Sequence, residues 1–281
     1  MLILGNRIRR NFAALALAGS VSVAGACASA SSVSVQQEQQ LGADYARQIN
    51  QQMPILRDDN ATAYINRVGR SISQQADPRG IPYTFYIVNS DVVNAFSIPG
   101  GYVYVNRGLI ERASNASELA GVLSHEIGHV VERHSINQMA KAQNANNLLG
   151  VVYGVLLQRN PGTLEQIGVQ GLGTAVFAGF SRNDEREADR DGVIFTMRAG
   201  YNPLGLATMF QKLVDEQKTN PGRVSQFFAT HPMAQERITN VRAQIAQTPG
   251  ATNSNLVTDT REFQQFRTRI RSLTPYPSDR K

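Results

Sequence analysis

The chain has 281 residues, of which 42% are hydrophobic and 18% charged, with a formal net charge of +6 and one cysteine. A chain of this length can bury one sizeable core, and a single cysteine leaves no disulfide pair. Three arginines within the first ten residues account for half of the net charge, so the composition gives no indication of a nucleic-acid partner.

Residues 1–26 predict a secretory signal peptide. A basic start is followed by an apolar stretch from Phe12 to about Val23 and by small residues before Cys27. Cys27 is therefore the candidate acylated cysteine of a lipoprotein, although a leucine usually stands three residues before it. An ordinary signal-peptidase site at Ala28-Ser29-Ala30 is the alternative.

After the leader, residues 27–40 predict a tether rich in serine and glutamine. Helices are expected at Gln40–Gln51 and Asn60–Gln75. From Pro82 to Val105 the apolar period shortens and β-branched and aromatic residues dominate, which predicts a small sheet.

The next element is a long helix that begins at Asn115. Asn115 with Glu118 three residues on is typical of a capping box, and the helix is expected to run to about Lys141. Apolar residues at helical spacing mark its buried face: Leu119, Val122, Leu123, Ile127 and Val130.

This helix carries the segment SHEIGHVVERH. His125 and His129 are four residues apart, so both project from one face and can reach one ion. Glu126 lies next to the first histidine, as in the H-E-x-x-H metallopeptidases, where it can contact a water on the metal without binding the metal. The alternative is a core helix with hydrogen-bonded histidines. His134 is expected on the helix surface.

A catalytic zinc usually takes a third protein ligand, and the segment SRNDEREADRDG offers two acidic pairs. The helical face of Glu185 continues through small or apolar residues, whereas the face of Glu187 reaches Asp191 and Arg198. Glu185 is therefore the predicted ligand. Asp189, one turn later, is placed to accept a hydrogen bond from a zinc-bound imidazole.

Further helices are expected at Ser181–Ala199, Pro203–Lys218 and Pro232–Gln247. The apolar stretch Leu148–Leu157 is about half as long as a membrane span and favours a buried helix or an active-site cover. Residues 248–281 are expected to form a loop, a short helix and a tail.

Several motifs together resemble one family. HEIGH, EREAD, Thr230–Ile238 (THPMAQERI) and Asn94–Leu109 (NAFSIPGGYVYVNRGL) are similar to the zinc peptidases of family M48, which contains HtpX, the CAAX prenyl endopeptidases, BepA and LoiP. The resemblance implies an α+β fold over residues 41–247: a mostly helical, zincin-like (gluzincin) domain with a small β-sheet beside the active-site helix. It also implies one Zn2+ held by His125, His129 and Glu185, with Glu126 as base.

The resemblance further implies that Asn94, Ala95 and Phe96 form an edge strand that binds an extended substrate, although the pattern alone fits an interior strand almost as well. His231 matches a histidine that faces the zinc in relatives. It could donate a hydrogen bond to the oxyanion, or it could cap the metal as a fourth ligand in a resting state. The non-functional alternative is a solvent-facing residue at the start of a helix.

These features favour a zinc metalloendopeptidase that acts on protein or peptide substrates, with misfolded envelope proteins implied by the resemblance alone. The alternative is a chaperone-like or binding lipoprotein with latent activity. Alanine rather than aspartate follows Cys27, which by resemblance to Gram-negative lipoproteins implies the periplasmic side of the outer membrane, and a soluble periplasmic or secreted protein is the other possibility. In build, the chain is closest to the short lipoprotein members of the family.

Because Cys27 is the predicted lipid anchor, Cys27→Ser should move the protein from the membrane fraction to the soluble periplasm. Cell fractionation and immunoblotting measure this shift, with Ser31→Ala as the matched control that should stay in the membrane fraction. Membrane retention of Cys27→Ser would show that another anchor exists.

Overall fold

The computed structural model describes residues 33–142, 179–232 and 235–276. The predicted signal peptide, Cys27 and the apolar stretch Leu148–Leu157 lie outside the described residues.

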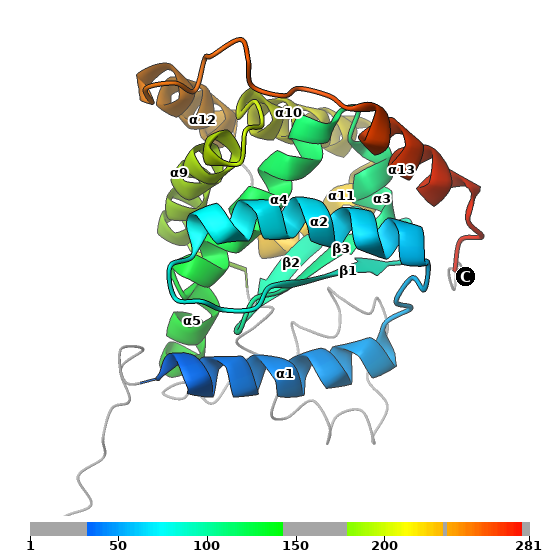
Figure 1. Cartoon of the computed structure of the whole chain (residues 1–281), viewed down its shortest axis with the longest axis vertical. Helices are drawn as coiled ribbons and strands as arrows, with labels where there is room; N and C mark the ends of the chain where they lie inside the picture. The colour runs from blue at the N-terminus through cyan, green and yellow to red at the C-terminus, as the bar shows by residue number, and fades with distance from the viewer. Residues whose placement is uncertain (1–32, 143–178, 233–234, 277–281) are drawn as a thin grey trace, which may run out of the picture.

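The described chain is mostly helical with one small sheet, which confirms the predicted α+β class (Figure 1). In chain order, its elements are α1 (Val35–Gln52), α2 (Asp59–Ala76), β1 (Thr84–Val88), β2 (Ala95–Ile98), β3 (Tyr102–Asn106), α3 (Arg107–Arg112), α4 (Ala116–Val131), α5 (His134–Ala142), α9 (Arg182–Arg198), α10 (Leu204–Thr219), α11 (Pro221–Thr230), α12 (Gln235–Gln247) and α13 (Arg261–Ser272).

The sheet has the strand order β1-β3-β2, with β1 parallel and β2 antiparallel to the central β3. Strand β2 therefore lies at an edge, as predicted for the segment that begins at Asn94. The β2–β3 turn needs glycine because Gly100 and Gly101 have φ angles of 78° and 84°. The turn lies against α1, where a methyl group on Gly42 would collide with the carbonyl oxygen of Pro99.

Helix α4 is the centre of the core. All of its residues from Ala116 to Val130 are buried, and it packs against α2, α9 and α10. Glycines allow the close approach: a methyl group on Gly128 would lie 3.2 Å from the Cα of Ala188 in α9, and one on Gly121 would collide with the backbone of Leu206 in α10. Helix α4 is thus fixed from several sides, and its two predicted metal ligands are fixed with it.

The long predicted helix is interrupted, which corrects the expectation that it runs to Lys141. Helix α4 ends at Val131, and Arg133 adopts a left-handed conformation with φ 57° before α5 starts at His134. The side chain of Arg133 holds this turn in place, because it donates to Glu38 Oε2 (2.9 Å) and to the carbonyl oxygen of Val33 (2.6 Å) in the N-terminal segment.

The start of α4 also differs from the predicted capping box. Asn115 accepts the amide N–H of Glu118, but the Glu118 carboxylate turns to the amide of Ser114 and to Lys212. Helix α1 begins at Val35, so the last six residues of the segment predicted as a tether are helical.

The chain beyond residue 247 joins the same core. Phe266 of α13 stacks on Tyr64 of α2 with ring centroids 4.3 Å apart. Just before α13, the carbonyl oxygen of Thr258 and the carboxylate of Asp259 accept the first backbone N–H groups of α4, at Ser117 and Ala116. The C-terminal segment thus satisfies donors at the start of the central helix.

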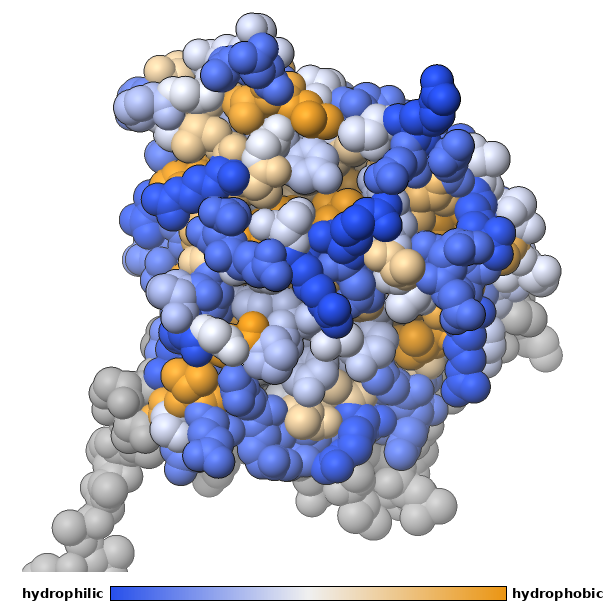
Figure 2. Space-filling view, in the orientation of Figure 1, coloured by the Kyte–Doolittle hydropathy of each residue, from blue (hydrophilic) through white to orange (hydrophobic). Residues whose placement is uncertain are grey.

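The surface in Figure 2 is largely hydrophilic, with apolar side chains gathered in separate small areas on this face. Within the described ranges, no helix has the length and apolar character needed to cross a membrane.

Candidate metal centre

Four buried side chains from three helices converge beside the sheet. His125 and His129 come from α4, Glu185 from the first turns of α9, and His231 from the residue that ends α11. One nitrogen or carboxylate oxygen from each lies within 4.8 Å of the others. The structure therefore brings together the three ligands predicted from the sequence and adds His231 to them.

The donor atoms face one another. The Nε2 atoms of His125 and His129 are 3.1 Å apart, and Glu185 Oε1 lies 3.5 Å from the second of them. The other ring nitrogen of His125, Nδ1, lies 3.0 Å from Asp189 Oδ1, so a proton on Nδ1 leaves a lone pair on Nε2.

Buried lone pairs that point at one another are unfavourable without a cation between them. Two imidazoles and a carboxylate are also a donor set that suits zinc. The chemistry and burial of the residues present therefore fit a divalent transition-metal ion.

Close helix packing sets this geometry. Residue 192 of α9 lies directly against α4, where an added methyl group would be in van der Waals contact with the backbone nitrogen of His125, at 3.4 Å. Glu185 and Asp189 are one turn apart on the face of α9 that is turned to α4, whereas the side chain of Glu187 is about half exposed. This orientation is the one that the sequence pattern predicted.

Arg237 of α12 is a site residue that the sequence analysis missed. Its guanidinium donates to both oxygens of Asp189, at 2.8 and 2.7 Å, and also pairs with Glu185 Oε2. It is buried and lies over the ring of Phe210, 4.7 Å from the centroid. The available signal was its place in the motif THPMAQERI, six residues after His231.

This arginine governs the charge of the acidic residues. Burial alone raises the pKa of Asp189, but the charge and hydrogen bonds of Arg237 outweigh burial and hold the pKa below its usual value. The pKa of Glu185 also lies well below its ordinary value, because the charges of His231 and Arg237 overcome the effect of burial. Both carboxyls are therefore ionised at neutral pH.

The pKa of His129 lies well below its usual value, chiefly because burial disfavours the imidazolium. A neutral imidazole is the form that binds a metal.

Glu126 lies beside the four candidate metal ligands, His125, His129, Glu185 and His231, which we call the metal cluster, and it is not one of them. Ser97 Oγ of β2 donates to Glu126 Oε2 at 3.2 Å, and Glu126 Oε1 lies 3.3 Å from His231 Nε2. The carboxylate thus lies between the edge strand and the candidate ligands, where a base rather than a ligand is expected.

The structure places the other two histidines of the chain at the site as well. His231 is fully buried among the candidate ligands, as the resemblance implied, and this excludes the solvent-facing alternative; the unpredicted helix α11 delivers it into the core. His134 was expected on a helix surface, yet it is 2% exposed and its Nδ1 lies 2.9 Å from Nδ1 of His129. The break after α4 turns it back toward the site.

The predicted substrate strand adjoins the cluster. Asn94 precedes β2 and is buried, and both polar atoms of its amide lack a hydrogen-bond partner among the described residues. Ala95 and Phe96 lie within β2, and the carbonyl oxygen of Ala95 is 3.3 Å from His231 Nε2. The outer edge of β2, which pairs with no other strand among the described residues, therefore lies next to the metal cluster.

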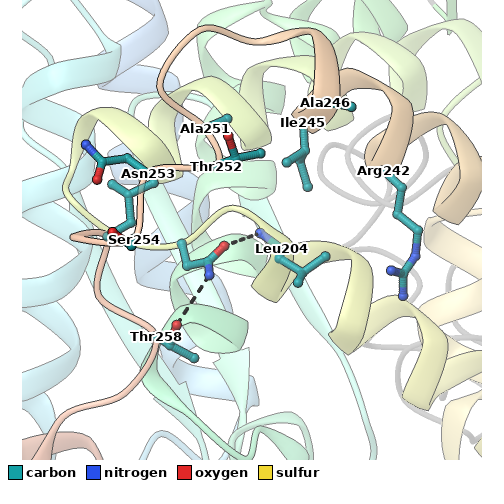
Figure 3. A pocket seen from close by; sticks show the side chains of 11 residues that line it. Leu204, Arg242, Ile245, Ala246, Ala251, Thr252, Asn253, Ser254 and Thr258 are labelled. Carbon is teal, nitrogen blue, oxygen red and sulfur yellow. Dashed lines mark hydrogen bonds between the residues drawn. The ribbon is translucent and has the colours of Figure 1, made fainter.

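A surface pocket of about 440 Å³ lies elsewhere, between α10, the end of α12 and the loop that follows it (Figure 3). Leu204, Ile245 and Leu256 provide its apolar lining, and Arg242 is its one charged lining residue. None of the residues of the metal cluster lines this pocket.

The chain was compared with known proteins. The model of peptidase family M48 matches residues 59–245, and the chain belongs to this family. It is 32% identical to the beta-barrel assembly-enhancing protease of Escherichia coli K12 over 220 residues. The aligned segment covers 75% of this chain and 44% of that protein. It is 31% identical over 188 residues to metalloprotease LoiP of the same organism, covering 66% and 69% of the two chains.

A more distant relative is the mitochondrial metalloendopeptidase OMA1 of Schizosaccharomyces pombe, at 27% identity over 180 residues, 64% of this chain and 52% of that protein. The chain spans less than half the length of the beta-barrel assembly-enhancing proteases that it matches.

Substitutions of Glu185 and Glu187 in α9 should have opposite outcomes. Glu185→Ala should remove a ligand and lower bound zinc well below one per chain, whereas Glu187→Ala should keep about one zinc per chain at saturating metal. Metal analysis of the dialysed proteins measures both, and circular dichroism confirms that each variant is folded. Loss of zinc in Glu187→Ala with retention in Glu185→Ala would reassign the ligand.

Proposed function

We propose that this protein is a zinc-dependent metalloendopeptidase. One observation carries the proposal: Glu126 lies beside the buried group of His125, His129, Glu185 and His231 without belonging to it. A structural zinc site needs only its protein ligands, whereas a catalytic site also needs a base that is close to the metal and does not bind it, and Glu126 has this position. Membership of peptidase family M48 supports the same reaction class.

Zinc held by these residues would supply a water of lowered pKa and polarise the scissile carbonyl. Glu126 accepts the proton of the attacking water and returns it to the departing amine, as general acid–base catalysis requires. Ser97 holds one oxygen of this carboxylate and leaves the other turned toward the cluster. The edge of β2 offers main-chain groups to an extended substrate, which would add to the sheet as a further strand.

His231 supports a capped resting arrangement. Its Nδ1 lies 3.1 Å from Glu185 Oε1 and 3.4 Å from His125 Nε2, among the candidate ligands. A fourth protein ligand in this place would fill the position that a catalytic zinc keeps open for water. Movement of His231 would then be needed to admit substrate, and the same imidazole could stabilise the oxyanion once displaced.

We further propose that the enzyme acts in envelope protein quality control, on misfolded or misassembled proteins at the periplasmic side of the outer membrane. The support is similarity to a protein named for enhancing β-barrel assembly, together with the lipoprotein-like leader. The candidate anchor is Cys27, and the soluble periplasm is the alternative location if Ala28-Ser29-Ala30 is the cleavage site.

A second candidate function is a chaperone-like or binding protein with latent proteolysis. The observation that favours it is the position of His231 among the ligands, since a permanently capped metal would bind no water. Cleavage of casein by the purified mature chain, abolished by a chelator and restored by zinc, separates the two candidates. No cleavage under any zinc concentration would favour the binding protein.

Because Glu126 is a base and not a ligand, Glu126→Gln should abolish casein cleavage and leave about one zinc per chain. The amide cannot accept the proton, and removal of such a base lowers kcat by about 10²- to 10⁴-fold. Ser97→Ala is the milder partner variant, because it removes only a hydrogen bond to the carboxylate. Turnover of Glu126→Gln close to wild type would exclude the assigned role.

The capping role of His231 predicts that His231→Ala raises the rate of substrate entry and retains zinc. An oxyanion role predicts instead that kcat falls about 10²- to 10³-fold with little change in KM. Steady-state kinetics together with zinc stoichiometry decide between them. Activity within twofold of wild type would remove His231 from the mechanism.

A further inference from the structure

The Nδ1 atoms of the two candidate ligand histidines of α4, His125 and His129, face different partners. Nδ1 of His125 lies 3.0 Å from the Asp189 carboxylate, a direct partner of the kind that usually orients a metal-binding imidazole. Around His129 the described residues place no carboxylate in that position. Its Nδ1 instead faces another imidazole, Nδ1 of His134, at 2.9 Å.

We propose that His134 and Glu187 form a relay that fixes the tautomer and orientation of His129 for metal binding. This inference rests on the proposed zinc site and adds two positioning residues to it. The relay runs from His129 Nδ1 to His134 Nδ1, and from His134 Nε2 to Glu187 Oε2 at 3.1 Å.

The proton positions follow from the geometry. His129 presents Nε2 to the cluster, so a bound metal needs the lone pair of Nε2 and the ring proton on Nδ1. His134 Nδ1 must then accept that proton and cannot carry one itself, so the ring proton of His134 lies on Nε2. Glu187 Oε2 stands where this Nε2–H group can donate. Every polar hydrogen in the relay has an acceptor.

Packing fixes the ring of His129, and the path of the chain positions His134. Phe180 stacks on the ring of His129 with centroids 3.8 Å apart and an interplanar angle of 17°, which closes one face of the imidazole. The left-handed Arg133 turns the chain so that His134 starts α5 beside His129 rather than continuing along α4. The turn at Arg133 therefore places His134 against the candidate metal ligand His129, where it can orient that ring. A histidine on the helix surface could not do so.

The test uses two substitutions of His134 that differ in one atom type. Asn Oδ1 occupies the position of His Nδ1 relative to the backbone, so His134→Asn retains an acceptor for His129, whereas His134→Phe keeps a ring and has no acceptor. Gln138→Ala, one turn along α5, is the matched control. Zinc affinity of the full mature chain is measured by competition with a chromophoric chelator.

We expect His134→Phe to weaken zinc binding by about 10- to 100-fold, the usual effect of losing a partner of a metal-bound histidine. His134→Asn and the control should stay within about threefold of wild type. Glu187→Ala should show a smaller loss than His134→Phe, because its side chain is about half exposed and water can replace it. Unfolding of the metal-free proteins shows whether a loss reflects general destabilisation.

Equal losses in His134→Phe and His134→Asn, or no loss in either, would overturn the relay. A wild-type chain that binds no zinc would instead refute the proposed metal site. If the substituted proteins do not fold, nitrogen NMR of the zinc-loaded wild type still decides the matter. The relay requires a proton on Nδ1 of His129 and on Nε2 alone of His134, and any proton on Nδ1 of His134 would contradict it.

Discussion

The close contact of α4 and α9 is the constraint on which the site depends. Gly128 lacks the side chain that would press against the α9 backbone, so α9 lies within van der Waals distance of the α4 backbone. Only at this separation can Glu185 reach the histidines of the neighbouring helix. A methyl group on Gly128 would meet Cα and the carbonyl oxygen of Ala188, both at 3.2 Å, so the ligands would have to move apart.

The same contact concentrates negative charge in the core, and Arg237 compensates for it. Three acidic side chains lie close together around the histidines, and each is almost fully buried: Glu126, Glu185 and Asp189. Arg237 pairs with Glu185 and Asp189. A cation bound between Glu185 and the histidines would add further positive charge beside these acids. Removing one partner of such a buried ion pair costs about 3–5 kcal/mol. Binding of the proposed zinc would therefore be coupled to folding in this region.

The sequence was sufficient where a local pattern fixes the answer. The four-residue spacing places His125 and His129 on one face, and the apolar neighbours of Glu185 distinguish it from Glu187. It was insufficient where the answer depends on packing between distant segments. The burial of His231 depends on α11, a ten-residue helix that the sequence analysis did not predict, and the position of His134 depends on one left-handed residue held by Glu38. In the sequence Arg237 looks like an ordinary polar helix residue, and only the packing of α12 against α9 brings it to Asp189.

The central claim is that one zinc ion is held by residues of α4 and α9. Anomalous diffraction at the zinc absorption edge, from crystals of the zinc-loaded mature chain, tests it most directly. The account predicts one peak per chain at about 2.0–2.2 Å from Nε2 of His125, Nε2 of His129 and a carboxylate oxygen of Glu185. A zinc-loaded crystal with no peak among these atoms, or with its peak bound to other side chains, would contradict the account.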